Sequence, residues 1–277
     1  MTIPDRLEDA LGLIGEHPET QLLAGGTDFM VDVNFGYRRP DGVCALRRVV
    51  ELHGQREEED YLAIGAMTTY QEMLDGTLAE AVPGLAQAAR TVGSPQIRNA
   101  GTLGGNLGTS SPAGDTLPVL VALDATVVVA AAGGQRELSI GDFLTGPKRN
   151  ALQPGELIVE VRVPRRRGPQ EFLKVGARNA MVISICSLAL VIDLADRRVA
   201  CALGSVGPTV LRAREAEERA AQEIDWETGQ VDDPVFAREF GRLVAAEARP
   251  IDDHRSTAQY RRHAIGVLAE RALRRST

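Results

Sequence analysis

Residues 97–106 read Ile97-Arg98-Asn99-Ala100-Gly101-Thr102-Leu103-Gly104-Gly105-Asn106. They lie inside a 23-residue segment, Gly93 to Asp115, that contains six glycines and two prolines. A segment of this length is too long to be a routine connector in a compact domain. Its few charges and its apolar side chains, such as Leu103 and Leu107, argue against disorder. We therefore expect an ordered segment whose backbone is held against something else.

A second double glycine occurs earlier, in Gly25-Gly26-Thr27-Asp28, directly after the short apolar run Gln21–Ala24. Because glycine has no Cβ, a Gly-Gly pair lets a loop turn sharply and point successive N–H groups one way. Such a set of donors binds anions, and a helix that starts just after it adds its dipole. Thr27, Thr102 and Thr109 add hydroxyls, and Asn106 adds an amide. Neither loop carries a lysine, so the pattern favours two loops that converge on one stationary diphosphate.

The residues alone leave a second interpretation open, in which both double glycines are ordinary turns. The dinucleotide signature G-x-G-x-x-G is absent from both loops. Asp115 precedes a predicted helix, so its carboxylate suits either an N-cap or an acceptor for a cofactor hydroxyl. Lys174 lies in a predicted strand and suits either a solvent-facing position or a positive charge beside an electron-rich ring.

The composition bounds the function classes. The 277 residues allow one large domain or two modest ones, and a chain of this length folds without disulfides. Hydrophobic residues make up 44% and charged residues 25%, which is typical of a soluble globular protein. The net charge of −7 and the aromatic content of 4% disfavour a nucleic-acid binder, which needs a basic face and stacking platforms.

Targeting and metal-binding patterns are missing from the sequence. The N-terminus lacks the basic-then-apolar pattern of a signal peptide, and no apolar run reaches the roughly 20 residues that span a bilayer. The three cysteines, Cys44, Cys186 and Cys201, are too few for the four thiolates of a usual iron–sulfur cluster. The four histidines are scattered, which disfavours a zinc site. We therefore expect buried free thiols, a cytoplasmic location, no integral membrane segment and no metal site in this chain.

Hydrophobic periodicity divides the chain into two parts. The first part mixes predicted helices over 5–15, 78–92 and 118–123 with predicted strands over 21–24, 43–52, 61–66, 125–131 and 156–163. The basic stretch Pro164–Pro169 marks a boundary, and its arginines suit a solvated linker or a docking patch. The second part has predicted strands over 171–175, 183–192 and 199–206, then predicted helices over 211–221, 233–248 and 258–274. We therefore expect domains at 1–165 and 170–277, the second of α+β type.

The segment Ile97–Asn106, followed by Ser111-Pro112 and Asp115, resembles the FAD-binding medium subunit of the molybdenum hydroxylases. This family includes xanthine dehydrogenase and carbon monoxide dehydrogenase. Further segments match it in order: Leu23–Asp28, Ile64–Thr69, Gly155–Ile158, the pair Lys174 and Arg178, and Gly204–Val206. The resemblance implies an α+β chain, with a two-part α/β FAD-binding domain of PCMH type. A C-terminal domain with a small antiparallel sheet and helices is implied to follow it.

The resemblance also implies cofactor-binding residues. The first loop would wrap the FAD diphosphate from one side with Leu22, Leu23, Ala24, Gly25, Gly26, Thr27, Asp28 and Phe29. The second would meet it with Thr102, Gly104, Gly105 and Asn106. The polar parts of the cofactor would contact Thr109 and Asp115, the apolar side would contact Ile158, and Lys174 would lie near the isoalloxazine. One departure is Val182, which stands where the family often has an aspartate.

The function that the resemblance implies is electron transfer within a multi-subunit oxidoreductase, so no catalytic acid or base is assigned to this chain. The partners would be a small [2Fe-2S] subunit and a large molybdopterin subunit, assembled as a dimer of heterotrimers. The holoenzyme would act on a purine or other N-heterocycle, an aldehyde or CO, with NAD⁺ among the candidate acceptors. Two alternatives stay open: a scaffold subunit without FAD, and a stand-alone flavin reductase.

Overall fold

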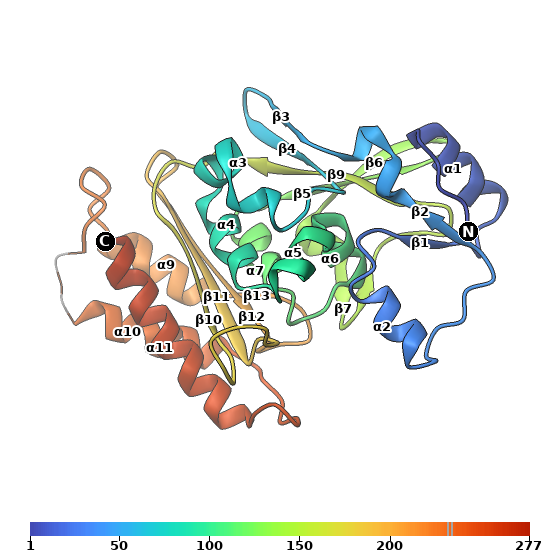
Figure 1. Ribbon diagram of the computed structural model, residues 1–277. Coiled ribbons are helices and arrows are strands. Elements are labelled where there is room, and N and C mark those ends of the chain that lie inside the picture. The colour runs from blue at the N-terminus through green and yellow to red at the C-terminus, as the bar shows by residue number, and fades with distance from the viewer. Residues whose placement is uncertain (232, 234) are drawn as a thin grey trace.

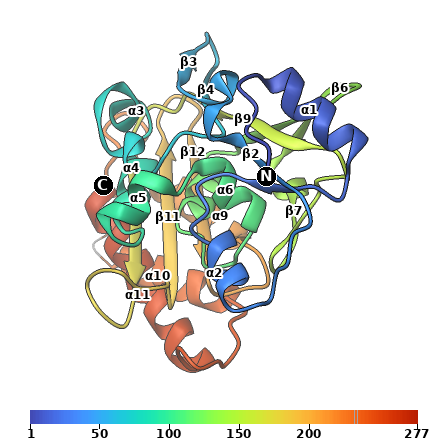
Figure 2. The same ribbon diagram turned by 45° about the vertical axis from the view of Figure 1, so that its right-hand side comes forward.

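The computed structural model describes residues 1–231, 233 and 235–277. A small N-terminal unit, a five-stranded sheet with helices, and a four-stranded sheet with helices follow one another along the chain (Figure 1). Helix α1 lies at the end of the molecule opposite α10 and α11 in both views (Figures 1 and 2). Among the residues that the structure describes, no helix combines the length and the apolar character needed to cross a membrane.

The N-terminal unit is built on a parallel pair of short strands. Its elements are α1 (Leu7–Glu16), β1 (Gln21–Leu23), α2 (Phe29–Asn34), β2 (Val43–Ala45), and the 3₁₀ turns η1 (Leu46–Arg48) and η2 (Val50–Leu52). The strand predicted over 43–52 is therefore wrong after Ala45. Its buried residues Leu46, Val49 and Leu52 recur every third position, which is the period of a 3₁₀ helix and not that of a strand.

The central unit carries an antiparallel sheet of order β3-β4-β9-β5-β6. Its strands are β3 (Gln55–Glu57), β4 (Tyr61–Gly65), β5 (Thr126–Ala131), β6 (Gly134–Ser139) and β9 (Leu157–Pro164). The remaining elements are η3 (Glu72–Leu74), α3 (Gly76–Ala81), α4 (Pro83–Arg90), α5 (Pro95–Ala100), α6 (Leu103–Thr109), α7 (Thr116–Ala122), α8 (Ile140–Phe143), β7 (Leu144–Gly146) and β8 (Arg149–Asn150).

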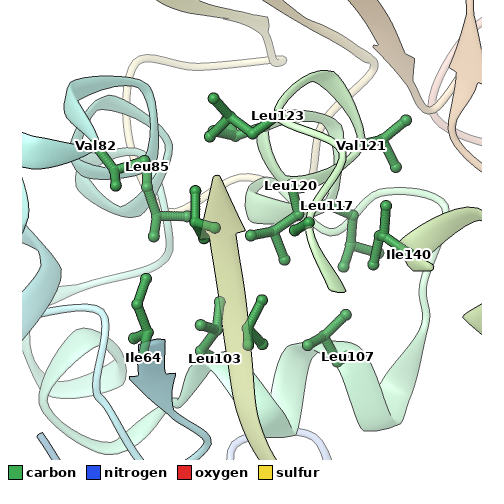
Figure 3. Packing of buried hydrophobic residues seen from close by; sticks show 14 of the residues in the cluster. Ile64, Val82, Leu85, Leu103, Leu107, Leu117, Leu120, Val121, Leu123 and Ile140 are labelled. Carbon is green, nitrogen blue, oxygen red and sulfur yellow. The ribbon is translucent and has the colours of Figure 1, made fainter. Parts of the chain in front are cut away.

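One predicted helix needs correction in this unit, and the glycine-rich segment contains helices that were not predicted. The single helix predicted over 78–92 is two helices, because Pro83 has no N–H to donate and instead begins α4 as its first residue. The glycine-rich segment that ends at Asp115 is ordered, as expected, but it contains the short helices α5 and α6. Figure 3 shows the reason for its order: Leu103 and Leu107 of α6 pack into one buried cluster with Leu117 and Leu120 of α7.

The C-terminal unit is an antiparallel sheet of order β10-β11-β12-β13 with three helices on one face. Its elements are β10 (Gln170–Val175), β11 (Cys186–Asp193), β12 (Arg198–Gly204), β13 (Leu211–Arg212), α9 (Arg214–Glu223), α10 (Phe236–Glu247) and α11 (Ala258–Ser276). The helix predicted from 211 begins only at Arg214, because Leu211 and Arg212 pair with β12. Residue 234, within the helix predicted over 233–248, lies outside the described residues.

Strand β11 is buried on both faces and joins the two larger units. Leu188 and Leu190 pack into the cluster formed with α9, α10 and α11, whereas Ala189 and Val191 pack into the cluster of the central unit. The sheet consequently stands between α4 and α7 on one side and the last two helices on the other (Figure 1).

The arginine run before β10 exposes Arg165 and Arg167, as expected of a solvated linker, but it is also bonded to its surroundings. The Arg166 side chain is 15% exposed and bonds to Asp193 at 3.2 Å and to Asp196 at 2.6 Å. Arg165 bonds to Glu57 at 3.0 Å. These contacts anchor the connection between the two sheets to both of them.

Candidate functional site

A cavity of about 890 Å³ opens between α2, α6 and the loops around them. This volume lies in the upper part of the range of about 300–1,000 Å³ that small-molecule sites occupy. Its walls come from segments distant in sequence: residues 21–38, Leu46, residues 66–70, 92–115, 148–158 and 181–183. The cavity therefore forms only when the N-terminal unit, the central unit and the loop after β10 come together.

The first double glycine brings the two glycine-rich loops into direct contact. A Cβ on Gly25 would lie 1.8 Å from the carbonyl oxygen of Ala100, so no other residue fits there without movement of the backbone. Gly26 has a φ of +75°, and its carbonyl accepts a hydrogen bond from Met30 as α2 begins. The N–H groups of residues 25–29 donate no hydrogen bond within the part of the chain that the structure describes. This loop therefore keeps a set of backbone donors for a ligand.

The second double glycine works differently from the expectation of a second N–H nest. The N–H of Leu103 donates to Thr68, that of Gly104 donates to Ala66, and that of Gly105 donates to the Thr102 hydroxyl at 3.0 Å. A Cβ on Gly104 would lie 2.7 Å from the Cβ of Ala66. The glycines here let α6 pack tightly against the end of β4. The segment offers side chains, and not these three N–H groups, to a ligand.

Fourteen of the sixteen residues expected to bind a cofactor line the cavity, and two do not. The fourteen are Leu22, Ala24, Gly25, Gly26, Thr27, Asp28, Phe29, Thr102, Gly104, Gly105, Asn106, Thr109, Asp115 and Ile158. Leu23 lines an adjoining hollow beside Met30 and Ala45, because alternation along β1 directs its side chain to the face opposite Leu22. Lys174 is buried behind the wall, where it contacts Asp115.

Asp115 is the most unusual polar group of the wall. It occupies the N-cap position of α7, but its carboxylate makes no capping hydrogen bond. Oδ2 instead lies 2.5 Å from Lys174 Nζ and 3.1 Å from the Thr91 hydroxyl. Oδ1 is buried and has no partner within the described residues. The capping interpretation of Asp115 and the solvent-facing interpretation of Lys174, which is 7% exposed, are therefore both wrong.

Burial also shifts the titration of the groups in this wall. Burial raises the pKa of Asp115, while the Lys174 ammonium and the hydrogen bonds from Lys174 and Thr91 oppose the rise. The Tyr70 ring lines the same cavity, and burial, together with the Asp115 and Asp28 carboxylates, raises the pKa of its phenol. Tyr70 therefore stays neutral at physiological pH and forms part of the wall.

Comparison with known proteins assigns this architecture. Residues 1–166 match the model of the FAD binding domain in molybdopterin dehydrogenase, and residues 171–276 match that of the CO dehydrogenase flavoprotein C-terminal domain. The chain belongs to the FAD-binding subunits of the molybdenum hydroxylase family. Family members are flavoprotein subunits of multi-subunit oxidoreductases, whose other subunits carry molybdenum and iron–sulfur centres. The resemblance, the α+β fold and the FAD cofactor expected from the sequence are thereby confirmed.

Individual relatives agree with this assignment. The chain is 35% identical to the nicotinate dehydrogenase FAD-subunit of Eubacterium barkeri, with 78% of this chain and 77% of that one aligned. It is 30% identical to the glyceraldehyde dehydrogenase medium chain of Sulfolobus acidocaldarius, over 98% and 95% of the two chains. A solved carbon monoxide dehydrogenase from Hydrogenophaga pseudoflava superposes with a TM-score of 0.86 at 27% identity, over 99% and 95% of the chains.

The cavity of this FAD-binding subunit suits FAD chemically. The unpaired N–H groups of the first loop suit a diphosphate. The buried, unpartnered Oδ1 of Asp115 suits a hydroxyl donor. Apolar side chains, among them Leu22, Leu152 and Ile158, suit a flat ring. No group of three or more metal-ligating side chains occurs in the described parts of the subunit.

Sequence reasoning missed the far wall of the subunit's cavity. This wall includes Met181, Val182 and Ile183, and it turns at Met181 in the left-handed conformation with a φ of +51°. Arg178 shapes the turn by donating to the carbonyls of Ala180 and Met181. A non-glycine residue in this conformation has no sequence signal, so only the departure at Val182 pointed to the segment.

The cap of α6 provides a test of how the second loop is held. Replacing Thr102 with alanine removes the acceptor for the Gly105 N–H and is expected to lower the free energy of unfolding by about 1 kcal/mol. Thr102→Ser, which keeps the hydroxyl, is expected to unfold at nearly the wild-type urea concentration. Equal urea midpoints for the alanine variant and the wild type would contradict this account of the loop.

Proposed function

We propose that the cavity between α2 and α6 is the FAD site of the subunit. The N–H groups of residues 25–29 would hold the diphosphate from one side, and Thr102, Asn106 and Thr109 would present side chains from the other. Ile158 would pack against an apolar part of the cofactor, and Asp115 would accept a hydrogen bond from a hydroxyl. The observation that carries the proposal is the meeting of unpaired donors and a buried, unpaired acceptor in one cavity of suitable volume.

The subunit would receive electrons from [2Fe-2S] centres in a small partner subunit and pass them to an external acceptor. When bound, the flavin supplies the redox chemistry, and the protein supplies binding, orientation and electrostatics. The residues of this chain then exclude water from the ring and fix the cofactor at the end of the electron path. We assign no proton transfer to any side chain of the subunit.

The proposal extends to the assembly, the substrate, the electron acceptor and the cellular location. The assembly would be a dimer of heterotrimers that includes a large molybdopterin subunit. Its substrate would be an N-heterocycle, a choice supported by the similarity to a nicotinate dehydrogenase subunit. NAD⁺ is the first acceptor to test. A cytoplasmic location is supported by the three cysteines, which are all buried free thiols, as expected in a reducing compartment.

Spectroscopy of the purified chain tests the proposal. We expect a flavin absorbance spectrum and one FAD per chain, released on denaturation and identified by chromatography. A chain that is folded, colourless and unable to take up added FAD would support the scaffold alternative instead. Stopped-flow mixing with NADH separates the remaining alternative, because fast reduction of the isolated chain is expected of a stand-alone reductase.

A further inference from the structure

An ion pair behind the cavity wall joins the central unit to the C-terminal unit. Lys174 of β10 and Asp115, which immediately precedes α7, lie 59 residues apart in sequence. Their side chains are 7% and 6% exposed, and Nζ and Oδ2 are 2.5 Å apart. Isolated charges at such burial are costly, so each of the two groups depends on the other.

The carboxylate of Asp115 is bonded asymmetrically. Both of its donors, the Lys174 ammonium and the Thr91 hydroxyl, approach Oδ2. Oδ1, the oxygen of the same group without a partner, belongs to a residue that lines the cavity. Because buried carboxylate oxygens in proteins are nearly always hydrogen-bonded, this oxygen lacks a donor that a ligand would supply.

The two donors are not equivalent. The Thr91 hydroxyl lies 2.8 Å from the Ala88 carbonyl and 3.1 Å from Oδ2 of Asp115, and its single hydrogen serves one of them at a time. Lys174 has three N–H groups, and a second one donates to the Thr91 carbonyl at 3.3 Å. Lys174 therefore fixes the carboxylate, and Thr91 supports it.

We propose that Lys174 and Thr91 are positioning residues that keep the Asp115 carboxylate ionised and turned so that Oδ1 accepts a hydrogen bond from a hydroxyl of bound FAD. This inference rests on the proposed FAD site. It also replaces the expectation that Lys174 itself lies beside the isoalloxazine. In this arrangement the ammonium acts on the cofactor only through Asp115.

The ionised state of Asp115 depends on its surroundings. Burial raises the pKa of this carboxyl, and the Lys174 ammonium is the main group that opposes the rise. The other titratable groups coupled to this part of the wall are the Tyr70 phenol, which stays neutral, and the Asp28 carboxylate, which acts on Tyr70. Without Lys174, the Asp115 pKa would rise further, and a protonated carboxyl would lose its accepting charge as the pH falls.

A double-mutant cycle on the full chain tests the proposal, with the FAD dissociation constant measured by flavin fluorescence. We expect Lys174→Met to weaken FAD binding by on the order of 10- to 100-fold, as for a lost hydrogen bond to a charged group. Lys174→Arg should recover part of the loss. If Lys174 acts only through Asp115, then Lys174→Met combined with Asp115→Asn should bind FAD no more weakly than Asp115→Asn alone.

The pH dependence of FAD affinity distinguishes a positioning role from a merely structural one, because a structural role would leave it unchanged. For Lys174→Met, FAD affinity should fall as the pH is lowered from 8 to 6, whereas the variants that carry Asp115→Asn should show no such fall. If Lys174→Met does not fold, Thr91→Val serves as the second variant. Valine has nearly the shape of threonine, and the ion pair between Lys174 and Asp115 is kept. We expect Thr91→Val to weaken binding a few-fold and Thr91→Ser to restore it.

Two results would overturn the proposal. One is wild-type affinity in both Lys174→Met and Thr91→Val. The other is a cycle in which the effects of Lys174→Met and Asp115→Asn on affinity simply add, which would mean that Lys174 contacts the cofactor directly. Failure of the wild-type chain itself to bind FAD would instead refute the proposed FAD site, so the two failures are distinguishable.

Discussion

Replacing Gly25 with alanine is expected to abolish tight FAD binding. The added Cβ would lie 1.8 Å from the Ala100 carbonyl oxygen and 2.6 Å from its carbon. Both atoms belong to the backbone, so neither can rotate away and the two loops must separate. We expect a cost of about 3 kcal/mol, which corresponds to roughly a 100-fold weaker FAD dissociation constant, measured by fluorescence titration.

Gly12 provides the matched control for this substitution. It lies on the exposed side of α1, and a Cβ there would meet no atom within 4 Å. Gly12→Ala should therefore leave FAD affinity unchanged and stabilise the chain by up to about 1 kcal/mol, because alanine favours a helix more than glycine does. If Gly25→Ala bound FAD as tightly as Gly12→Ala, direct contact between the loops would not be essential to the site.

The second large effect is expected at Arg261, a fully buried arginine of α11. Its guanidinium donates to the carbonyls of Ile185 and Ser205, at 2.8 and 2.9 Å, and to Asp253 at 2.6 Å. Arg261→Met should lower the free energy of unfolding by about 3 kcal/mol, the lower end for a broken buried ion pair. The lower end applies because Asp253 keeps its contact with Arg255. Urea denaturation measures the loss.

Arg262, the next residue of α11, is exposed and serves as the control for charge and helix propensity. Arg262→Met should change the free energy of unfolding by less than about 0.5 kcal/mol, as for most surface substitutions. Similar urea midpoints for the two variants would show that the buried hydrogen bonds of Arg261 contribute little to stability.

Elements with a clear hydrophobic period could be predicted from the sequence. The strands at 125–131 and 171–175 are close to the observed β5 and β10, because alternation or continuous burial marks a strand directly. The 3₁₀ turns after Ala45 could not, since a three-residue period over two short turns resembles an irregular strand. Propensity also gives no warning of a helix such as α6, whose three glycines are tolerated only because Leu103 and Leu107 are fully buried.

The residues that line the candidate site could be predicted from the sequence, but the ion pairs and hydrogen bonds between them could not. The double-glycine loops pointed to the segments that line the cavity, and the family resemblance supplied isolated positions such as Ile158. The pairing of Asp115 with Lys174 depends on how α7 packs against the four-stranded sheet, which no local pattern encodes. The same holds for the N–H groups of α6, whose partners Thr68 and Ala66 lie more than thirty residues earlier in the chain.

Those satisfied N–H groups bear on how the cofactor is acquired. The first N–H groups of α6 donate to Thr68, Ala66 and Thr102, so this helix is held in place without a nucleotide. The N–H groups of residues 25–29 still have no acceptor among the residues that the structure describes, so we expect loading to require a change in this short loop and not the refolding of a domain. Maturation of the subunit can therefore follow its folding, and chain stripped of flavin should be recoverable as active material by simple reconstitution.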